Sequence, residues 1–291
     1  MRIGLAANQL HHSHADAALF RWLQASERGV RELGIVLCAV GRTHAAIAAH
    51  HALDGYDKLI RYPYGRQGGL MKLVAEIVGL PDEGRLLDGA IYLIDPVDPS
   101  SIFPEAVALK RQCVINHKPF ISTVASARDW VEVERIHASL PPDPGADDLH
   151  GLERHTLALI AHDAMKEQML AYAAAHFDVL SRFAQRVATG TTGHRLNEMA
   201  WSLGWPRDTP WVRRYQSGPL GGDAQIADLV LERRCQRAIF FEDPHVARQH
   251  EADIQLLERA VTTLTDDAVC MTSPRVAVRW AEAVRKRAAR G

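Results

Sequence analysis

Residues 238–244 read AIFFEDP, an apolar run that ends in Asp-Pro, and residues 90–96 read AIYLIDP. A short run of large apolar and aromatic residues closed by a turn signal is typical of a buried strand. The two copies lie 148 positions apart, which is about half of the 291-residue chain. This spacing indicates that the chain repeats one structural unit.

Two further features recur in the same order in both halves. A Gly-Gly pair follows a strand-like stretch at residues 68–69 and again at 221–222, and each half closes with a helical stretch that carries one tryptophan, Trp130 and Trp280. These offsets of 153 and 150 positions agree with the first to within a few residues. Three matches in register predict a duplicated domain with small changes in loop length.

The segment between the two copies is residues 140–148, LPPDPGADD. Three prolines, a glycine and three acidic residues are unsuited to a helix or a strand ladder. We therefore expect a first domain over residues 1–138, a linker over 139–153 and a second domain over 154–291.

The second half alternates short apolar runs with helical stretches. This pattern predicts parallel strands joined by right-handed helical crossovers, and hence an α/β fold in which each domain is a doubly wound parallel sheet flanked by helices. In such folds ligands bind outside the carboxyl ends of the strands. The expected strands are 157–161, 186–188, 211–215 and 238–241, and the expected helices are 166–182, 224–232 and 251–261.

Composition and charge exclude several classes of protein. Hydrophobic residues make up 47% and charged residues 24%, and the net charge is −1, which argues against a nucleic-acid partner. The longest apolar stretches, such as residues 89–94, are too short to span a membrane, and the first residues lack the features of a signal peptide. Four cysteines without a CxxC pair predict a reduced protein in the cytoplasm.

The residues that follow the four expected strands of the second half include many groups suited to binding an anion or transferring a proton. Threonine and glycine turns that enter helices offer backbone N–H groups and hydroxyls to an oxyanion, although threonine is also a common helix cap. Converging carboxylates raise one another's pKa, as acid–base catalysis requires, whereas a single Asp after a strand is more often a turn residue. The Asp and His spacings form no recognised metal motif. The segments are His162-Asp163 with Lys166, TGTTG at 189–193, SGPLGGD at 217–223, and Asp243 followed by His250 and Asp253.

These motifs, in this order, resemble methylglyoxal synthase over about residues 155–261, and the first half resembles a degenerate copy of the same domain. The resemblance implies the conversion of dihydroxyacetone phosphate to methylglyoxal and inorganic phosphate, without metal or organic cofactor. It also implies a homo-oligomer, typically a hexamer, a phosphorylated small-molecule substrate, and inorganic phosphate as product and candidate inhibitor. Residues 194–216, rich in tryptophan, and the stretch after residue 261 depart from the family pattern.

The resemblance also assigns roles to individual residues. It implies that Asp223 is the catalytic base and that His162 or His250 polarises the substrate carbonyl. Asp163, Asp243 and Asp253 match further acids of the family's active site. The residues implied to line the substrate site are His162, Lys166, Thr189, Gly190, Thr191, Thr192, Ser217, Gly218 and His250.

The first half keeps the strand and turn features of the repeat but lacks the candidate site residues of the second half. Aligning residues 5–8 with 160–163 places Ala7 at His162 and Asn8 at Asp163, and Leu70 falls at Asp223. Leucine accepts no proton, so we expect the first half to be a scaffold or a regulator. The alternative function for the whole chain is a non-catalytic allosteric module that binds a phosphorylated metabolite, as related domains of carbamoyl-phosphate synthetase do.

Overall fold

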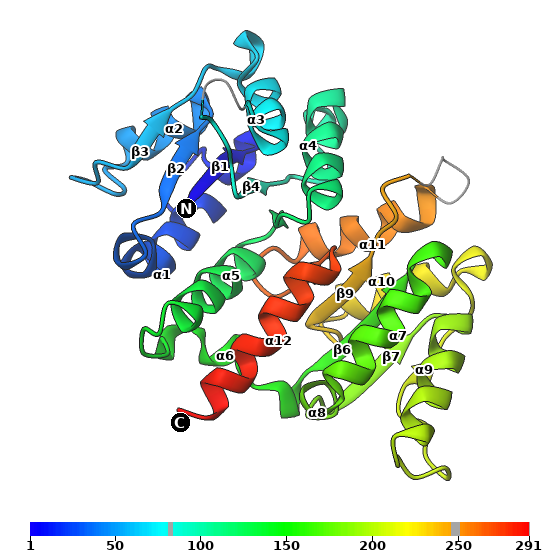
Figure 1. Cartoon of the computed structure of the whole chain (residues 1–291). Helices are drawn as coiled ribbons and strands as arrows, with labels where there is room; N and C mark the ends of the chain where they lie inside the picture. Colours follow the sequence, from blue (N-terminus) through cyan, green and yellow to red (C-terminus); the bar gives the residue numbers. More distant parts are fainter. Residues whose placement is uncertain (81–83, 246–250, 291) are drawn as a thin grey trace. The chain divides into compact units, whose positions relative to one another are not determined.

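The computed structural model describes residues 1–80, 84–245 and 251–290, and the chain divides into two compact units, Met1–Gly145 and Ala146–Gly291 (Figure 1). The boundary between the units falls inside residues 139–153. That segment is partly helical, because residues Pro144–Ala146 and Leu152–Arg154 form 3₁₀ turns and α6 spans Asp147–His150. Each unit contains one five-stranded sheet in which all paired strands are parallel.

In unit 1 the strands lie in the order β3-β2-β1-β4-β5. Strand β1 is central, and the chain runs outward to β3 before it returns to β4 on the other side. The elements are β1 (Arg2–Ala7), α1 (Ala18–Glu32), β2 (Val36–Ala39), α2 (Gly41–Ala49), β3 (Leu59–Arg61), α3 (Gly69–Val78), β4 (Gly89–Leu93), α4 (Pro104–Ile115), β5 (Phe120–Ile121) and α5 (Val124–His137).

Unit 2 has the same topology, with the order β10-β9-β6-β7-β8. The order in which the chain adds strands therefore reverses between β6 and β9, as it does in unit 1 between β1 and β4. The elements are β6 (Thr156–Ala161), α7 (Lys166–Ala175), α8 (Phe177–Leu180), β7 (Gln185–Ala188), α9 (Gly190–Ser202), β8 (Arg213–Arg214), α10 (Gly222–Leu231), β9 (Arg237–Phe241), α11 (Glu251–Thr263), β10 (Val269–Met271) and α12 (Pro274–Ala288).

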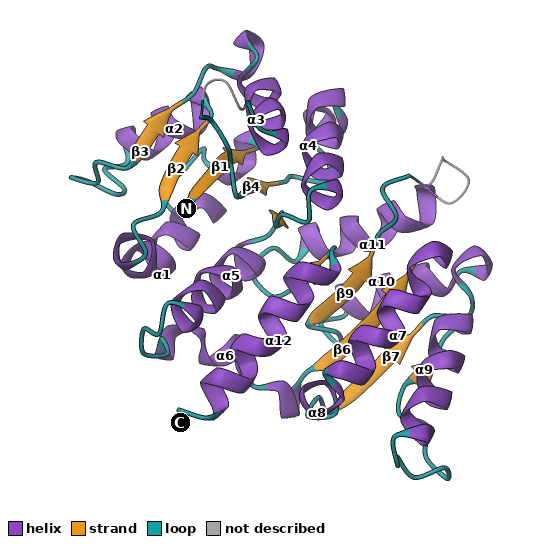
Figure 2. Cartoon of the chain, in the orientation of Figure 1, coloured by secondary structure: helices purple, strands orange, loops and turns teal. Residues whose placement is uncertain are grey.

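Helices cover both faces of each sheet (Figure 2). In unit 1, α1 and α5 bury one apolar cluster that includes Trp22 and Trp130, while α3 and α4 bury a second cluster that includes Leu73 and Leu109. The central strands are buried on both faces, which explains why β4 and β9 read as continuous apolar runs rather than as alternating ones. The prediction of two tandem doubly wound α/β domains is confirmed.

Two expectations at the level of elements need adjustment. The helix expected over residues 166–182 is two helices, α7 and α8, separated at His176. The strand expected over 211–215 is shorter, because only Arg213 and Arg214 pair with β7. Among the described residues, no helix has the length and apolar character needed to cross a membrane.

Candidate active site

The site predicted from the sequence begins at the topological switch point of unit 2, between β6 and β9, where the strand order reverses. His162 directly follows β6, and its backbone N–H donates to the carbonyl of Phe241, the last residue of β9, at 3.1 Å. The carboxyl ends of two neighbouring strands therefore meet at this residue. Doubly wound sheets bind their ligands at this kind of switch point.

The imidazole of His162 is held by the backbone of the neighbouring loop. Its Nδ1 accepts a hydrogen bond from the N–H of Asp243 at 2.8 Å, and its ring packs edge-to-face on Phe240. Because Nδ1 is an acceptor here, the single proton of a neutral His162 ring is on Nε2. The local fold thus fixes the tautomer of this side chain and presents Nε2 as a donor.

The aspartates near His162 do not share one role. Asp243 Oδ1 accepts the N–H of His245 at 2.8 Å, which forms an Asx turn after β9. Asp163 is exposed and forms an ion pair with Lys166 in the first turn of α7. Asp243 therefore shapes the loop as well as contributing charge, and Asp163 holds the Lys166 ammonium at the end of β6.

The threonine-rich loop leaves the start of α9 without a side-chain cap. Thr189 is the N-cap residue, but its hydroxyl makes no capping hydrogen bond, so helix capping does not account for this threonine. The N–H of Gly190 donates to the carbonyl of Gln216 at 2.9 Å. The N–H groups of Thr191 and Thr192 belong to the first turn of α9 and have no carbonyl partner within the helix, which makes them suitable donors to an anion.

Close approach of backbones brings the two glycine-rich loops together. A Cβ atom on Gly190 would lie 2.8 Å from the Cα and N atoms of Ser217, so only glycine fits there. A Cβ atom on Gly218 would lie 2.7 Å from Oδ2 of Asp223. The carboxylate of Asp223, in the first turn of α10, thus lies directly against the loop at residues 217–218.

Two predicted site residues receive no side-chain description. His250 lies outside the described residues, and Asp253 lies in α11 but its side chain is not described. The residues that the structure gathers at the carboxyl ends of β6, β7, β8 and β9 are His162, Asp163, Lys166, Thr189, Gly190, Thr191, Thr192, Ser217, Gly218, Asp223 and Asp243.

Gln216, which the sequence pattern does not single out, joins the two loops. Its carbonyl accepts the Gly190 N–H, and its own N–H donates to Oε1 of Gln225 on α10 at 3.0 Å. Gln216 makes both bonds through its backbone, so its residue type does not indicate this role in the sequence.

Two tryptophans of the tryptophan-rich residues 194–216, Trp205 and Trp211, pack at the amino end of β7. Arg186, near the amino end of β7, lies over the rings of Trp205 and Trp211 at 5.4 and 5.5 Å. Its Nε donates to the Trp211 carbonyl at 2.8 Å. The insertion therefore builds a stacked cluster at the amino end of β7, and these tryptophans do not close the candidate site.

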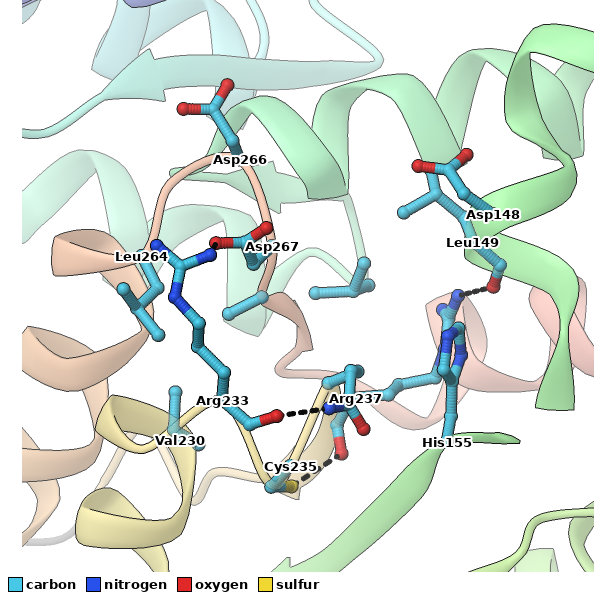
Figure 3. Close-up of a pocket in the computed structure, with 13 residues that line it drawn as sticks. Asp148, Leu149, His155, Val230, Arg233, Cys235, Arg237, Leu264, Asp266 and Asp267 are labelled. Carbon is cyan, nitrogen blue, oxygen red and sulfur yellow. Dashed lines mark hydrogen bonds and ion pairs between the residues drawn. The ribbon is translucent and has the colours of Figure 1, made fainter. Parts of the chain in front are cut away.

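A separate cavity of about 230 Å³ lies at the amino ends of β6, β9 and β10 (Figure 3). Burial lowers the pKa of His155 in its wall, and the neighbouring Arg237 lowers that pKa further. Arg237 donates to the carbonyl of Leu149 at 3.0 Å, and Arg233 forms an ion pair with Asp267. This cavity contains none of the predicted site residues, and much of its charge is already paired within the protein.

In unit 1 the position of His162 is taken by Asn8. The N–H of Asn8 donates to the carbonyl of Leu93 at the end of β4, and Asn8 Oδ1 accepts the N–H of Asp95 at 3.1 Å. These are the two bonds that His162 makes with Phe241 and Asp243. The alignment of Ala7 with His162 is therefore wrong by one residue, because the hydrogen bonds at the strand ends place Asn8 there.

The sheet order and the loops at the switch point define the class of this protein, a doubly wound α/β protein with a candidate anion site at the carboxyl ends of its strands. No protein-family model matches the sequence. The chain is 48% identical to methylglyoxal synthase of Thermus thermophilus over 103 residues, which cover 35% of this chain and 75% of that protein. It is 43% identical to methylglyoxal synthase of Brucella anthropi over 107 residues, or 37% and 79% of the two chains.

Among solved structures, methylglyoxal synthase from Elizabethkingia anophelis NUHP1 is 34% identical, covers 41% of this chain and 72% of that one, and has a TM-score of 0.35. On the sequence relationships, the chain belongs to the methylglyoxal synthase family. The relationship extends over about a third of the chain, which is less than the length of one unit.

Proposed function

We propose that the second domain, residues 154–291, is a methylglyoxal synthase that converts dihydroxyacetone phosphate to methylglyoxal and inorganic phosphate. The observation that carries the proposal is the carboxylate of Asp223, which lies against Gly218 between two loops that offer backbone donors. A base next to an anion-binding loop is the arrangement that proton removal from a phosphorylated substrate requires.

Asp223 acts as the general base. It removes a proton from C3 of the substrate, and the electron pair of that C–H bond forms the C2–C3 double bond of an enediolate. The C3 hydroxyl then loses its proton and becomes the aldehyde carbonyl, the C2–C3 electron pair shifts to C1–C2, and the C1–O bond breaks, so that phosphate leaves and takes up that proton. The remaining enolate is protonated at C1, which yields methylglyoxal. A positioned base of this kind contributes about 10²- to 10⁴-fold to the rate.

His162 donates to the oxygen at C2. With Nδ1 engaged by the Asp243 N–H, the ring presents its Nε2 proton, which can stabilise the charge that develops on the carbonyl oxygen. His250, which lies outside the described residues, is the second proton-transfer group that the resemblance implies. Asp163, Asp243 and Asp253 are proposed as acids that support the site.

The phosphate binds between α9 and α7. The first-turn N–H groups of Thr191 and Thr192 and the dipole of α9 supply a neutral donor set, and Lys166 supplies a positive charge. Thr189, Gly190, Ser217 and Gly218 shape the same loops. Donors here accelerate the reaction to the extent that they favour the departing dianion over the bound ester.

Unit 1 is proposed as a scaffold or regulator and the protein as a homo-oligomer. The test of the activity is to incubate the purified chain with dihydroxyacetone phosphate and EDTA and to assay methylglyoxal and phosphate. Equal amounts of the two products, formed in the presence of EDTA, are expected. Absence of turnover would favour the non-catalytic module that binds a phosphorylated metabolite.

A further inference from the structure

The carboxyl edge of the sheet in unit 1 repeats that of unit 2 almost bond for bond. Besides the Asn8 contacts, the N–H of Gly41 donates to the carbonyl of Pro63 at 3.1 Å, as Gly190 does to Gln216. Asp95 Oδ1 accepts the N–H of Val97 at 3.0 Å, as Asp243 does from His245. Position-by-position comparison of the two edges is therefore justified by hydrogen bonds.

This comparison shows a systematic change of charge. The acids at positions 163 and 223 are replaced in unit 1 by Gln9 and Leu70, while the neutral positions 191 and 219 are replaced by Arg42 and Arg66. Lys166 corresponds to His12, so a basic residue is kept there. Unit 1 has thus lost the groups that move protons and gained positive charge at the loops that bind an anion in the proposed site of unit 2.

The basic residues of this edge come from the ends of three neighbouring strands. We call the cations Arg42, Arg61 and Arg66, together with the neighbouring His12 and His44, the cationic edge. Burial and the nearby Arg42 lower the pKa of His12, and burial and the nearby Arg61 lower that of His44, so each of these histidines lies within electrostatic reach of one arginine. Within the described part of the chain, Arg42, Arg61 and Arg66 form no ion pair with an acid.

Tyr64 fixes part of the cationic edge next to the start of α2. A Cβ atom on Gly41 would lie 2.7 Å from the Tyr64 ring, and the Arg61 guanidinium lies over the same ring at 5.2 Å. Val40 is the N-cap of α2 and has no side-chain donor or acceptor, so the N–H groups of Arg42 and Thr43 in the first turn receive no cap.

The acids at this edge are already engaged. Asp98 accepts hydrogen bonds from Asn8 Nδ2 at 3.1 Å and from the Ser100 N–H at 2.8 Å, and Asp95 accepts the Val97 N–H. These bonds hold the two carboxylates within the loop after β4. They do not neutralise the arginines that follow β2 and β3.

We propose that the cationic edge of unit 1 is a second, non-catalytic site that binds a small phosphorylated anion. Guanidinium groups and first-turn N–H groups are strong phosphate donors, and Leu70 provides no base to act on a bound ester. The site is distinct from that of unit 2, and it binds its ligand whether or not unit 2 turns over a substrate.

The probe is inorganic phosphate, titrated calorimetrically into the full chain at low salt. The test variant is Arg42→Ala/Arg66→Ala, and the matched control is Arg182→Ala/Arg207→Ala, which removes two exposed arginines of unit 2 that also form no ion pair among the described residues. We expect the test variant to lose one phosphate per chain, or to bind it at least about tenfold more weakly. The control should bind phosphate as the wild type does.

Turnover of dihydroxyacetone phosphate without added phosphate, measured on the same three proteins, separates this proposal from that for unit 2. We expect the test variant to keep wild-type turnover within about twofold, since Arg42 and Arg66 lie outside the proposed active site. Wild-type phosphate stoichiometry and affinity in the test variant would overturn the second site. So would an equal loss in the control, because binding would then follow net charge alone.

Discussion

The Nδ1 atom of His162 accepts a hydrogen bond from the backbone N–H of Asp243 at 2.8 Å, which joins the ends of β6 and β9. The bond has two consequences. It ties the two strands at the switch point of the sheet, and it directs the proton of a neutral imidazole to Nε2. Structure and proposed chemistry therefore depend on different nitrogen atoms of one ring.

Replacement of His162 by asparagine should separate these two roles. In unit 1, Asn8 Oδ1 accepts the equivalent Asp95 N–H at 3.1 Å, so asparagine is compatible with this position of the fold. We expect His162→Asn to keep most of the stability but to lower kcat by about 10²-fold or more. Thermal unfolding and steady-state kinetics measure the two effects.

His162→Ala is the matched comparison, because it removes the acceptor as well. It leaves the Asp243 N–H without its partner and should lower the free energy of unfolding by about 1–3 kcal/mol relative to His162→Asn. Equal stability of the two variants would show that the bond to Asp243 contributes nothing to the fold.

Asp243 and Asp95 allow a comparison between the two units. Each accepts the N–H of the second following residue through Oδ1, at 2.8 and 3.0 Å, and asparagine preserves that bond. We expect Asp243→Asn to lower kcat by about tenfold or more and Asp95→Asn to leave kcat within a few-fold of wild type. If Asp95→Asn abolished turnover, the assignment of catalysis to unit 2 would be wrong.

Gly218 and its counterpart Gly65 test the position of the Asp223 carboxylate. A Cβ on Gly218 meets Asp223 Oδ2 at 2.7 Å, whereas a Cβ on Gly65 meets nothing within 4 Å. Gly218→Ala should displace the carboxylate and reduce kcat by about tenfold or more, because catalysis is sensitive to displacements of about 1 Å. Gly65→Ala should leave both kcat and stability near wild type, and similar losses in both variants would argue against this geometry.

Asp178 gives unit 2 a defined acid dependence of stability. Its hydrogen bond with Arg285 of α12 lowers the pKa of Asp178 from 3.8 to about 2. The folded state therefore gains stability above pH 3.8, and this gain is lost as the pH falls towards 2. Because the pair is largely exposed, Asp178→Asn should cost no more than about 1 kcal/mol near pH 7.

Chemical denaturation at several pH values tests this sign. The difference between wild type and Asp178→Asn should shrink towards zero near pH 2, while Asp208→Asn, in the exposed loop after α9, should show no such difference. A difference that grew with falling pH would exclude the proposed pair as its cause.

The sequence was sufficient for the fold because the strands are buried on both faces. Continuous apolar runs such as 238–241 mark central strands of a parallel sheet, and the predicted run lies within β9 (Arg237–Phe241). The site followed from the fold, since residues after parallel strands gather at one edge. His162 and Asp223 could thus be selected before their neighbours were known.

The rest depended on interactions that residue types do not encode. Ala7 and Ala161 both end a strand, so only the hydrogen bonds at the strand ends reveal that Asn8 corresponds to His162. The break at His176 was missed because the helical pattern continues through it. The position of the Trp211 cluster could not be predicted, because its partner, Arg186, lies 25 residues away in the sequence.

The central claim is that Asp223 of unit 2 removes the proton that starts the reaction. The direct measurement is the rate of methylglyoxal and phosphate release from dihydroxyacetone phosphate by Asp223→Asn. Asp228→Asn, the same change at an exposed position of α10, is the control. The account predicts a fall in kcat of at least about 10²-fold for Asp223→Asn, with unchanged thermal stability, and near wild-type kcat for the control. Retention of more than about a tenth of wild-type kcat by a folded Asp223→Asn protein would contradict it.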